Sequence, residues 1–297
     1  MIPAERGFLL LSSHLGVKCR NPLTTTQLRL LADRVRGSTI ESAARDLEVT
    51  DLISLGYGAE MAAHIHRLLN EEDVLDYYLR KGQILGCTPV TRVSENYPLH
   101  LRKRLGLDSP GVLWARGDLN LLQQPMVALV GSRELRKENW QFATEAGRQA
   151  ALQGYVLVSG NARGADRTAQ ESCLEAGGKV ISVVADELWK QPMRENMLYL
   201  SEMDYEEAFS SQRALSRNRI IHALGIVTFV AQSSFHKGGT WDGTIKNLQN
   251  RWSDVYGFDD GSNAMTELAQ MGLELIGMND LADFYELPKS EQNIFDR

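Results

Sequence analysis

The chain has 297 residues, of which 43% are apolar and 24% charged, and its 32 basic and 38 acidic side chains give a net charge of −6. This composition excludes disordered and fibrous classes, and the length predicts about two domains at ~150 residues each. Cys19, Cys87 and Cys173 form no Cys-x-x-Cys pair, which argues against a disulfide framework or a zinc ribbon and favours a cytoplasmic location. No apolar run approaches the roughly 20 residues of a membrane span, so no membrane association is expected.

Residues 1–87 are predicted to form a helical domain. The threonines at 24–26 are candidate N-caps of a helix, and an apolar turn with two glycines at 52–58 precedes another helix, with apolar residues at 61, 65, 68 and 69. This order is typical of a helix-hairpin-helix or SAM-like module, whose backbone N–H groups can approach a DNA phosphate. A small helical bundle, in which the glycines only cap helices, is the simpler interpretation.

Residues 88–125 contain several Pro and Gly turn signals and are predicted to be a linking extension that packs on a sheet. Within this segment, the basic run Arg102-Lys103-Arg104 is expected to form the solvated face of a helix.

From residue 126 onward, apolar strands alternate with helices. The expected strands are 126–130, 155–158, 180–184, 226–230, 255–258 and 273–276, and the expected helices include 139–154 and 165–176. Buried strands separated by helices indicate a parallel sheet covered on both faces. Residues 126–297 are therefore predicted to be a doubly wound, mostly parallel, Rossmann-like α/β domain.

The loops after these strands carry the candidate functional residues, because ligands of open α/β sheets bind at the carboxyl ends of the strands. Glycines allow close approach of a ligand, short hydroxyl side chains donate hydrogen bonds, and arginines match phosphate oxygens. Glycines at strand ends are also required by topology, but that does not explain arginine in three loops. The predicted phosphate-binding residues are Gly131, Ser132, Arg133, Ser159, Gly160, Arg163, Gly164, Arg217, Asn218, Arg219, Lys237, Gly238, Gly239 and Thr240.

The sequence lacks the motifs of several other kinds of site. The chain has no Gly-x-Gly-x-x-Gly loop after the first strand of the Rossmann-like domain, no Walker loop and no Gly-x-Ser-x-Gly elbow, and its six histidines are scattered. Asp166 is expected to cap a helix, Asp242 has no acidic or histidine partner at a useful spacing, and His222 is expected on a helix surface. We therefore expect a binding protein with no cofactor, no metal and no catalytic residue.

Several runs resemble the DprA/Smf family of bacterial DNA-processing proteins. The most specific are VALVGSR at 127–133, LVSGNARGADRTAQ at 157–170 and LSRNRIIHALG at 215–225. The segments 96–122 and 265–287 and the N-terminal hairpin also resemble the family, so the likeness covers nearly the whole chain. The chain would be a divergent member without the winged-helix domain of many relatives.

This resemblance implies an extended Rossmann fold that binds single-stranded DNA without sequence preference, protects it, forms a homodimer and loads a RecA-type recombinase. The setting would be natural transformation, or a mobile-element or defence role. The implied DNA-phosphate pocket comprises Gly131, Ser132, Arg133, Ser159, Gly160, Arg163, Gly164, Arg217 and Arg219, with Lys237 as a further cationic contact.

Two other functions remain open at this point. The same arginines would serve a sensor that holds a small nucleotide signal and reports to a partner. The loop GGTWDGT at 238–244 also resembles that of lysine-decarboxylase-like phosphoribohydrolases, although Asn247 stands where those enzymes carry a glutamate.

Overall fold

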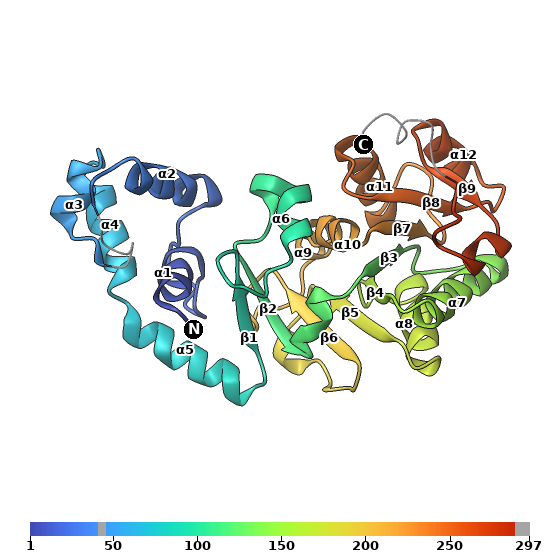
Figure 1. The fold of residues 1–297 in the computed structure, drawn as a ribbon, viewed down its shortest axis with the longest axis horizontal. Coiled ribbons are helices and arrows are strands. Elements are labelled where there is room, and N and C mark those ends of the chain that lie inside the picture. Colours follow the sequence, from blue (N-terminus) through green and yellow to red (C-terminus); the bar gives the residue numbers. More distant parts are fainter. Residues whose placement is uncertain (41–45, 289–297) are drawn as a thin grey trace.

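The computed structural model describes residues 1–40 and 46–288 (Figure 1), and its N-terminal part is helical. The helices of this part are α1 (Pro3–Ser12), α2 (Thr25–Arg36), α3 (Val49–Ser54), α4 (Ala59–Leu69) and α5 (Glu72–Ile84). Helices α1 to α4 bury leucines, with Ile65 and Ala62, in a core of their own.

The predicted caps and hairpin of this part are present. The Thr24 side chain accepts a hydrogen bond from the Gln27 backbone N–H (3.3 Å), and the Gln27 side chain accepts one from the Thr24 N–H (2.9 Å), which satisfies two free donors at the start of α2. Helices α3 and α4 form the hairpin. The Arg34 guanidinium lies 4.2 Å from the centre of the Tyr57 ring, so α2 holds the turn between them.

The remainder of the chain forms a sheet of nine strands within the described residues, in the order β1-β2-β6-β5-β4-β3-β7-β8-β9. The pairs from β6 to β9 are parallel, and β1 and β2 are antiparallel to their neighbours. The strands are β1 (Thr88–Thr91), β2 (Val112–Gly117), β3 (Met126–Val130), β4 (Val156–Ser159), β5 (Lys179–Val183), β6 (Met197–Ser201), β7 (Val227–Val230), β8 (Asp254–Phe258) and β9 (Glu274–Ile276).

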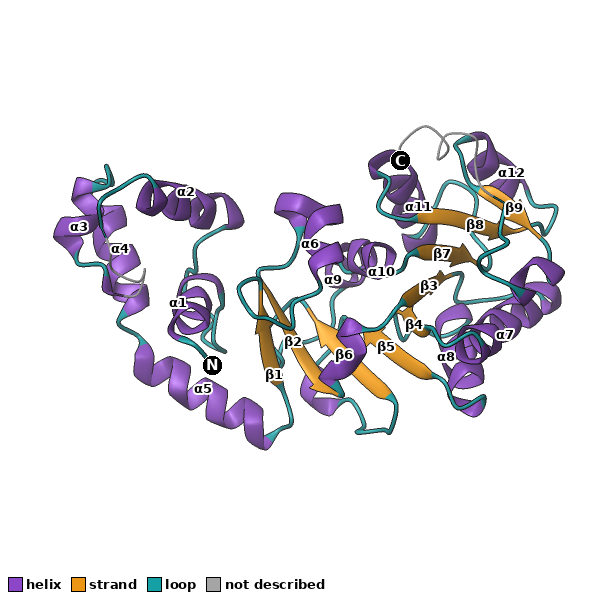
Figure 2. Ribbon diagram, viewed as in Figure 1, coloured by secondary structure: helices purple, strands orange, loops and turns teal. Residues whose placement is uncertain are grey.

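The six predicted strands are confirmed, and the sheet is larger than predicted. Residues 88–125, expected to pack on the sheet as an extension, instead contribute β1 and β2 to it, and β6 was not predicted. Strand β1 contains Pro89, which is tolerated because β1 is an edge strand. Two antiparallel strands thus extend the parallel sheet on the side that faces the N-terminal helices (Figure 2).

Helices cover both faces of the sheet, as Figure 2 shows. Strand β3 illustrates the alternation, since Val127 and Leu129 belong to one core while Ala128 and Val130 belong to the other. Side chains of α7 (Lys137–Leu152) and α8 (Ala165–Glu175) fill the first core. The second core contains side chains of α6 (Leu99–Leu105), α10 (Asn218–Leu224), α11 (Gly239–Asn250) and α12 (Asn263–Gln270). Helix α9 (Ser211–Ser216) directly precedes α10.

The basic run on α6 differs from its prediction as a solvated face. Lys103 is exposed, but Arg104 donates to the carbonyls of Ala223 (2.9 Å) and Gly225 (2.5 Å) at the end of α10. Burial lowers the pKa of Arg104. The guanidinium satisfies carbonyls that the helix itself leaves unpaired, which is a structural role.

An aromatic cluster joins the helical part to the sheet. The ring of Tyr78, on α5, stacks on Tyr205 at 4.4 Å, and Trp114, on β2, meets both rings edge-on. The Tyr205 hydroxyl donates to the Tyr78 carbonyl (3.0 Å). Because these side chains are almost completely buried, the two parts share a packed interface.

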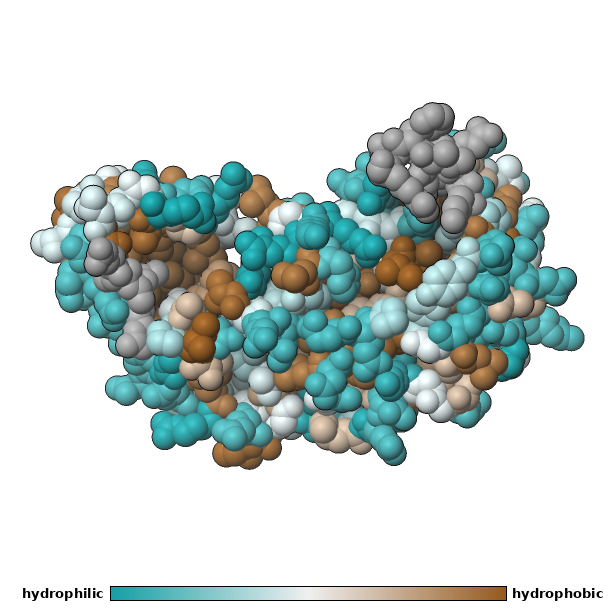
Figure 3. Space-filling model, viewed as in Figure 1, coloured by the Kyte–Doolittle hydropathy of each residue, from teal (hydrophilic) through white to brown (hydrophobic). Residues whose placement is uncertain are grey.

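The molecular surface of the sheet domain is largely hydrophilic on the face drawn in Figure 3, with separate apolar patches. In residues 1–40 and 46–288, no helix has both the length and the apolar character to cross a bilayer.

Candidate functional site

A cavity of about 590 Å³ lies at the carboxyl ends of β3 and β7. From β3, the strands β4, β5 and β6 are added in turn on one side of the sheet. The next strand, β7, pairs with β3 on the other side, so the order of strands reverses between β3 and β7. Such a switch point is where open α/β sheets bind ligands. Nine of the predicted residues line the cavity: Gly131, Ser132, Arg133, Arg217, Asn218, Lys237, Gly238, Gly239 and Thr240.

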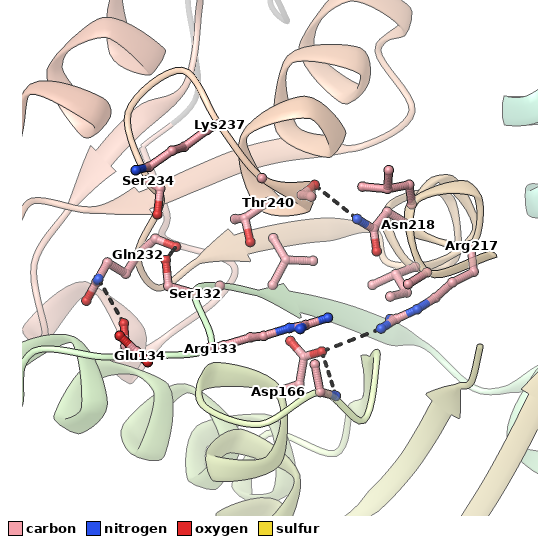
Figure 4. A pocket seen from close by; sticks show the side chains of 18 of the residues that line it. Ser132, Arg133, Glu134, Asp166, Arg217, Asn218, Gln232, Ser234, Lys237 and Thr240 are labelled. Atoms are coloured by element: carbon pink, nitrogen blue, oxygen red, sulfur yellow. Dashed lines mark hydrogen bonds and ion pairs between the residues drawn. The ribbon is translucent and has the colours of Figure 1, made fainter. Parts of the chain in front are cut away.

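Arg217 is the central cation of this cavity. It lies between α9 and α10, and its side chain is only 8% exposed. Its Nε and Nη1 atoms have no hydrogen-bond partner among the described residues, and its Nη2 atom lies 4.0 Å from Asp166 Oδ2. Burial lowers the pKa of Arg217, and the carboxylate of Asp166 opposes that change. The guanidinium is therefore buried with unused donors beside an open cavity (Figure 4).

Glycine at position 160 makes room for this arginine. A Cβ atom on Gly160 would stand 1.5 Å from Arg217 Nη1, so any side chain there would displace the guanidinium. Gly164 has a φ of +86°, and a Cβ atom on it would stand 2.4 Å from the Ser132 carbonyl oxygen. These two glycines allow protein segments to pack together, whereas the sequence suggested that they admit a phosphate.

Asp166 organises the loop after β4. Its Oδ2 atom accepts a hydrogen bond from the Ala162 backbone N–H (3.1 Å), so it binds the loop that precedes α8, whereas a cap of the helix N–H groups was expected. Burial raises the pKa of Asp166, and the charge of Arg217 and the Ala162 hydrogen bond oppose that rise. The carboxylate thus holds the loop and balances part of the charge of Arg217.

The start of α11 forms the opposite wall. Its N-cap residue, Gly238, has a φ of +90° and no side chain to accept a hydrogen bond from the first turn. No described atom lies within 4 Å of where its Cβ would stand, so the backbone here is accessible. The first N–H groups of a helix are unpaired and carry partial positive charge. Figure 4 shows Lys237 on this side of the cavity and Arg133 beside Asp166 and Arg217 on the other.

A smaller cavity of about 320 Å³ adjoins the first, and Arg133 and Arg217 line both. Gly160 and Arg163 line this smaller cavity. The exposed Arg163 forms an ion pair with Glu134 (3.2 Å), a contact of little strength because both side chains face solvent. The two cavities are adjacent, since Ala162 and Ala214 also line both, and we call them together the phosphate path.

Three predicted residues line neither cavity. One of them is Gly164, which packs against the backbone of Ser132 and Arg133. Ser159 is fully buried at the end of β4 and lines neither cavity. Arg219 points away from the path, because its Nη2 atom lies 2.6 Å from Glu202 Oε2 and its Nε atom donates to the Asp108 carbonyl. The guanidinium groups of Arg217 and Arg219 therefore diverge, and the structure does not bring these two predicted residues together.

The prediction that His222 lies on a helix surface is also wrong. His222 is completely buried under α11, its Nδ1 atom lies 3.0 Å from the Asn247 amide nitrogen, and burial lowers its pKa to about 3. Asn247 is equally buried and also donates to Ser253 Oγ (2.9 Å). Neither side chain lines the cavity.

Some residues of the path were not predicted. Gln232 lies two residues after the end of β7, and its side chain binds the backbone of Arg136 (2.9 Å) and Glu134 (3.1 Å), which ties together the loops after β3 and β7. Its place after a strand was a usable signal. Phe209 lines the smaller cavity from an irregular segment, and nothing in the local sequence marked it. Among the described residues, no group of three or more His, Cys, Asp or Glu side chains is placed to hold a metal ion.

Comparison with known proteins gives consistent matches. The family model described as DNA recombination-mediator protein A matches residues 88–256, more than half of the chain. The DNA processing protein DprA of Streptococcus pneumoniae is 30% identical over 194 residues, covering 60% of this chain and 68% of that protein. DprA of Bacillus subtilis is 28% identical over 238 residues, covering 74% and 76%.

Solved structures agree with this match in fold. The structure of DprA from Streptococcus pneumoniae aligns with a TM-score of 0.72 at 23% identity, covering 98% of this chain and 99% of its own. A DprA structure from Helicobacter pylori, which describes a single-stranded DNA binding mode, aligns with a TM-score of 0.56 at 24% identity, covering 67% and 93%.

Proposed function

Because this chain belongs to the DNA recombination-mediator protein A family, also called DprA or Smf, we propose that it binds single-stranded DNA through phosphates held in the two cavities. One observation carries the proposal: the buried guanidinium of Arg217 has two nitrogen atoms without partners and faces the cavity. A buried donor left unpaired is costly, and phosphate oxygens would satisfy it.

The basic side chains of the path support a polyanion as the ligand. Arg133, Arg217 and Lys237 line the first cavity with two acidic residues, and the smaller cavity adds Arg163 and Asp186, so the linings hold four basic and three acidic side chains. The four basic groups suit phosphate oxygens, which are identical at every nucleotide, so binding would be independent of sequence.

We further propose that the protein acts as a homodimer, protects the strand and delivers it to a RecA-type recombinase. Family membership supports this role. Its test is filament assembly by a RecA-type recombinase on single strands already covered by a single-strand-binding protein. The full chain should accelerate assembly, and an unchanged rate would contradict the delivery step.

We propose binding without hydrolysis at this site. Phosphoribohydrolase-like loops carry an acid where Asn247 stands, and here that side chain is buried against His222 and Ser253. Asp166 is engaged with the Ala162 N–H and with Arg217. Incubation with nucleoside monophosphates, triphosphates and single strands, with and without magnesium, should release no free base and cleave no strand.

Fluorescence anisotropy tests the binding. The protein should bind a labelled single strand more tightly than a duplex, and nucleoside monophosphates should compete weakly. Arg217→Gln should lose most of this affinity, whereas Arg219→Gln should retain it because Arg219 is held by Glu202 outside the path. Circular dichroism would establish that both variants fold. Tight binding of a mononucleotide with no binding of strands would instead favour a nucleotide sensor.

A further inference from the structure

We propose that Phe209, in the smaller cavity, and Phe235, beside the larger one, are stacking positions for nucleobases. The proposal rests on the proposed binding of single-stranded DNA and adds what holds the bases. These residues are 54% and 47% exposed, which is unusual for phenylalanine.

Phe209 lies in the wall of the smaller cavity. The other lining residues include Arg133, Arg163 and Arg217, so one aromatic ring stands among three guanidinium groups. A nucleotide entering this cavity would place its phosphate against the arginines, and its base would meet the ring of Phe209.

Phe235 lies beside the larger cavity without lining it. It is in the loop between Ser234 and Lys237, both of which line the larger cavity. Its ring is parallel to that of His236, with 4.1 Å between centroids and 15° between planes, and it meets the largely buried Trp241 edge-on at 5.8 Å. One face of Phe235 is therefore supported by protein, and the exposed remainder can receive a base.

His236, which stacks on Phe235, has a further contact of its own. His236 Nε2 lies 2.7 Å from Glu267 Oε1 on α12, and His236 has a φ of +55°, a conformation that side-chain-bearing residues seldom adopt. Backbone strain of this kind persists where the surroundings hold it, and it clusters at ligand sites. His236 thus links the ring pair to α12.

Nucleobases are the occupants that fit these two positions. Every base has an aromatic face, so stacking tolerates any sequence, and proteins that bind single strands combine a cationic groove with aromatic side chains. Bases in a duplex are already stacked and cannot reach the rings. Two stacking positions therefore favour a single strand over both a duplex and a mononucleotide.

The experiment compares a labelled single strand with an abasic deoxyribose-phosphate strand of the same length, by fluorescence anisotropy on the full chain. Wild-type protein should prefer the strand with bases. Phe209→Ala and Phe235→Ala should each weaken binding of that strand by about tenfold and leave binding of the abasic strand unchanged. Wild type and both variants should show the same dependence of affinity on salt, because neither substitution removes a phosphate contact.

Three variants sharpen the comparison. Tyr77→Ala removes an exposed aromatic ring from α5, away from both cavities, and should change nothing. Phe235→Leu should lose most of the preference for bases because it keeps apolar bulk without an aromatic face, and Phe235→Trp should keep it.

The outcomes separate the two proposals. If wild-type protein binds both strands equally, or if the double variant Phe209→Ala/Phe235→Ala retains the wild-type preference for bases, the stacking proposal is wrong while the phosphate path stands. If wild-type protein binds neither strand, the proposed function itself is wrong, and the stacking positions with it.

Discussion

Lys237 and Arg217 illustrate two ways in which a single cation can serve the path. Arg217 is buried and preset by its neighbours, whereas Lys237 is exposed beside the accessible backbone of Gly238. A lysine of this kind acts as a point charge that displaces one counterion when a phosphate binds.

We therefore expect Lys237→Ala to weaken binding at low salt and to reduce the slope of log K against log salt by about 0.7, the value for one phosphate on a single strand. Lys18→Ala, an exposed lysine of the helical part, should leave the slope unchanged. Titrations at several salt concentrations measure both. Equal slopes for wild type and Lys237→Ala would show that this lysine touches no phosphate.

The buried His222 should make the stability of the protein depend on pH. Its pKa is about 3 in the folded protein against 6.5 for the free side chain, so protons bind preferentially to the unfolded chain. The stabilisation is complete above pH 6.5 and is lost as the pH falls toward 3. Lowering the pH from about 6.5 to about 4.5 should therefore reduce the free energy of unfolding by roughly 2–3 kcal/mol through this one group.

The variant His222→Gln tests this effect, because glutamine can still accept the Asn247 hydrogen bond but does not titrate. Urea unfolding should show a smaller loss of stability on acidification for the variant than for wild type. If acidification lowers the free energy of unfolding equally in the two proteins, His222 is not the source of the pH dependence.

At the scale of elements, the contact between α5 and the sheet depends on the ring stack of Tyr78, Trp114 and Tyr205. Tyr205→Ala should lower the free energy of unfolding by about 3–5 kcal/mol, because it removes a buried aromatic ring. It should also separate unfolding of the helical part from that of the sheet, giving two transitions in calorimetry where wild type gives one. Tyr205→Phe removes only the hydroxyl bond to the Tyr78 carbonyl and should cost about 1 kcal/mol.

The elements also mark how far sequence patterns reach. Most of the parallel strands were predictable because each is a short apolar run between helical segments, and β3 and β4 also end next to a glycine; β6 is parallel too but was missed. Strands β1 and β2 were missed because turn signals surround them and their partner β6 is remote in sequence. Contacts with remote segments also escape prediction in the site. The pattern around His222 does not reveal that α11 covers this side chain. The spacing of Arg217 and Arg219 does not reveal that Glu202 binds Arg219.

At the scale of the whole molecule, β9 is an edge strand and therefore a candidate for self-association. Of the apolar residues at 268–276, which include β9, Leu268, Leu273 and Ile276 are buried in the cores, while Met271 and Leu275 are 45% and 36% exposed. The proposed homodimer would use these two side chains.

Sedimentation at micromolar concentration should show a species of twice the chain mass. Leu275→Asp should shift it to the monomer without lowering the thermal midpoint of the monomer, since Leu275 contributes little to the core. A monomer in wild type at all concentrations would remove the dimer from the proposal.

The slot that Gly160 leaves for Arg217 has a consequence for how this protein can vary in evolution. A single change from glycine to any larger residue at 160 displaces the guanidinium, and loss of the arginine leaves a void where it lay. Each substitution alone is harmful, so the two positions, 57 residues apart in sequence, should covary across natural relatives. Chains that carry a side chain at the position of Gly160 should lack arginine at the position of Arg217, and they should bind DNA by another route or have lost that activity.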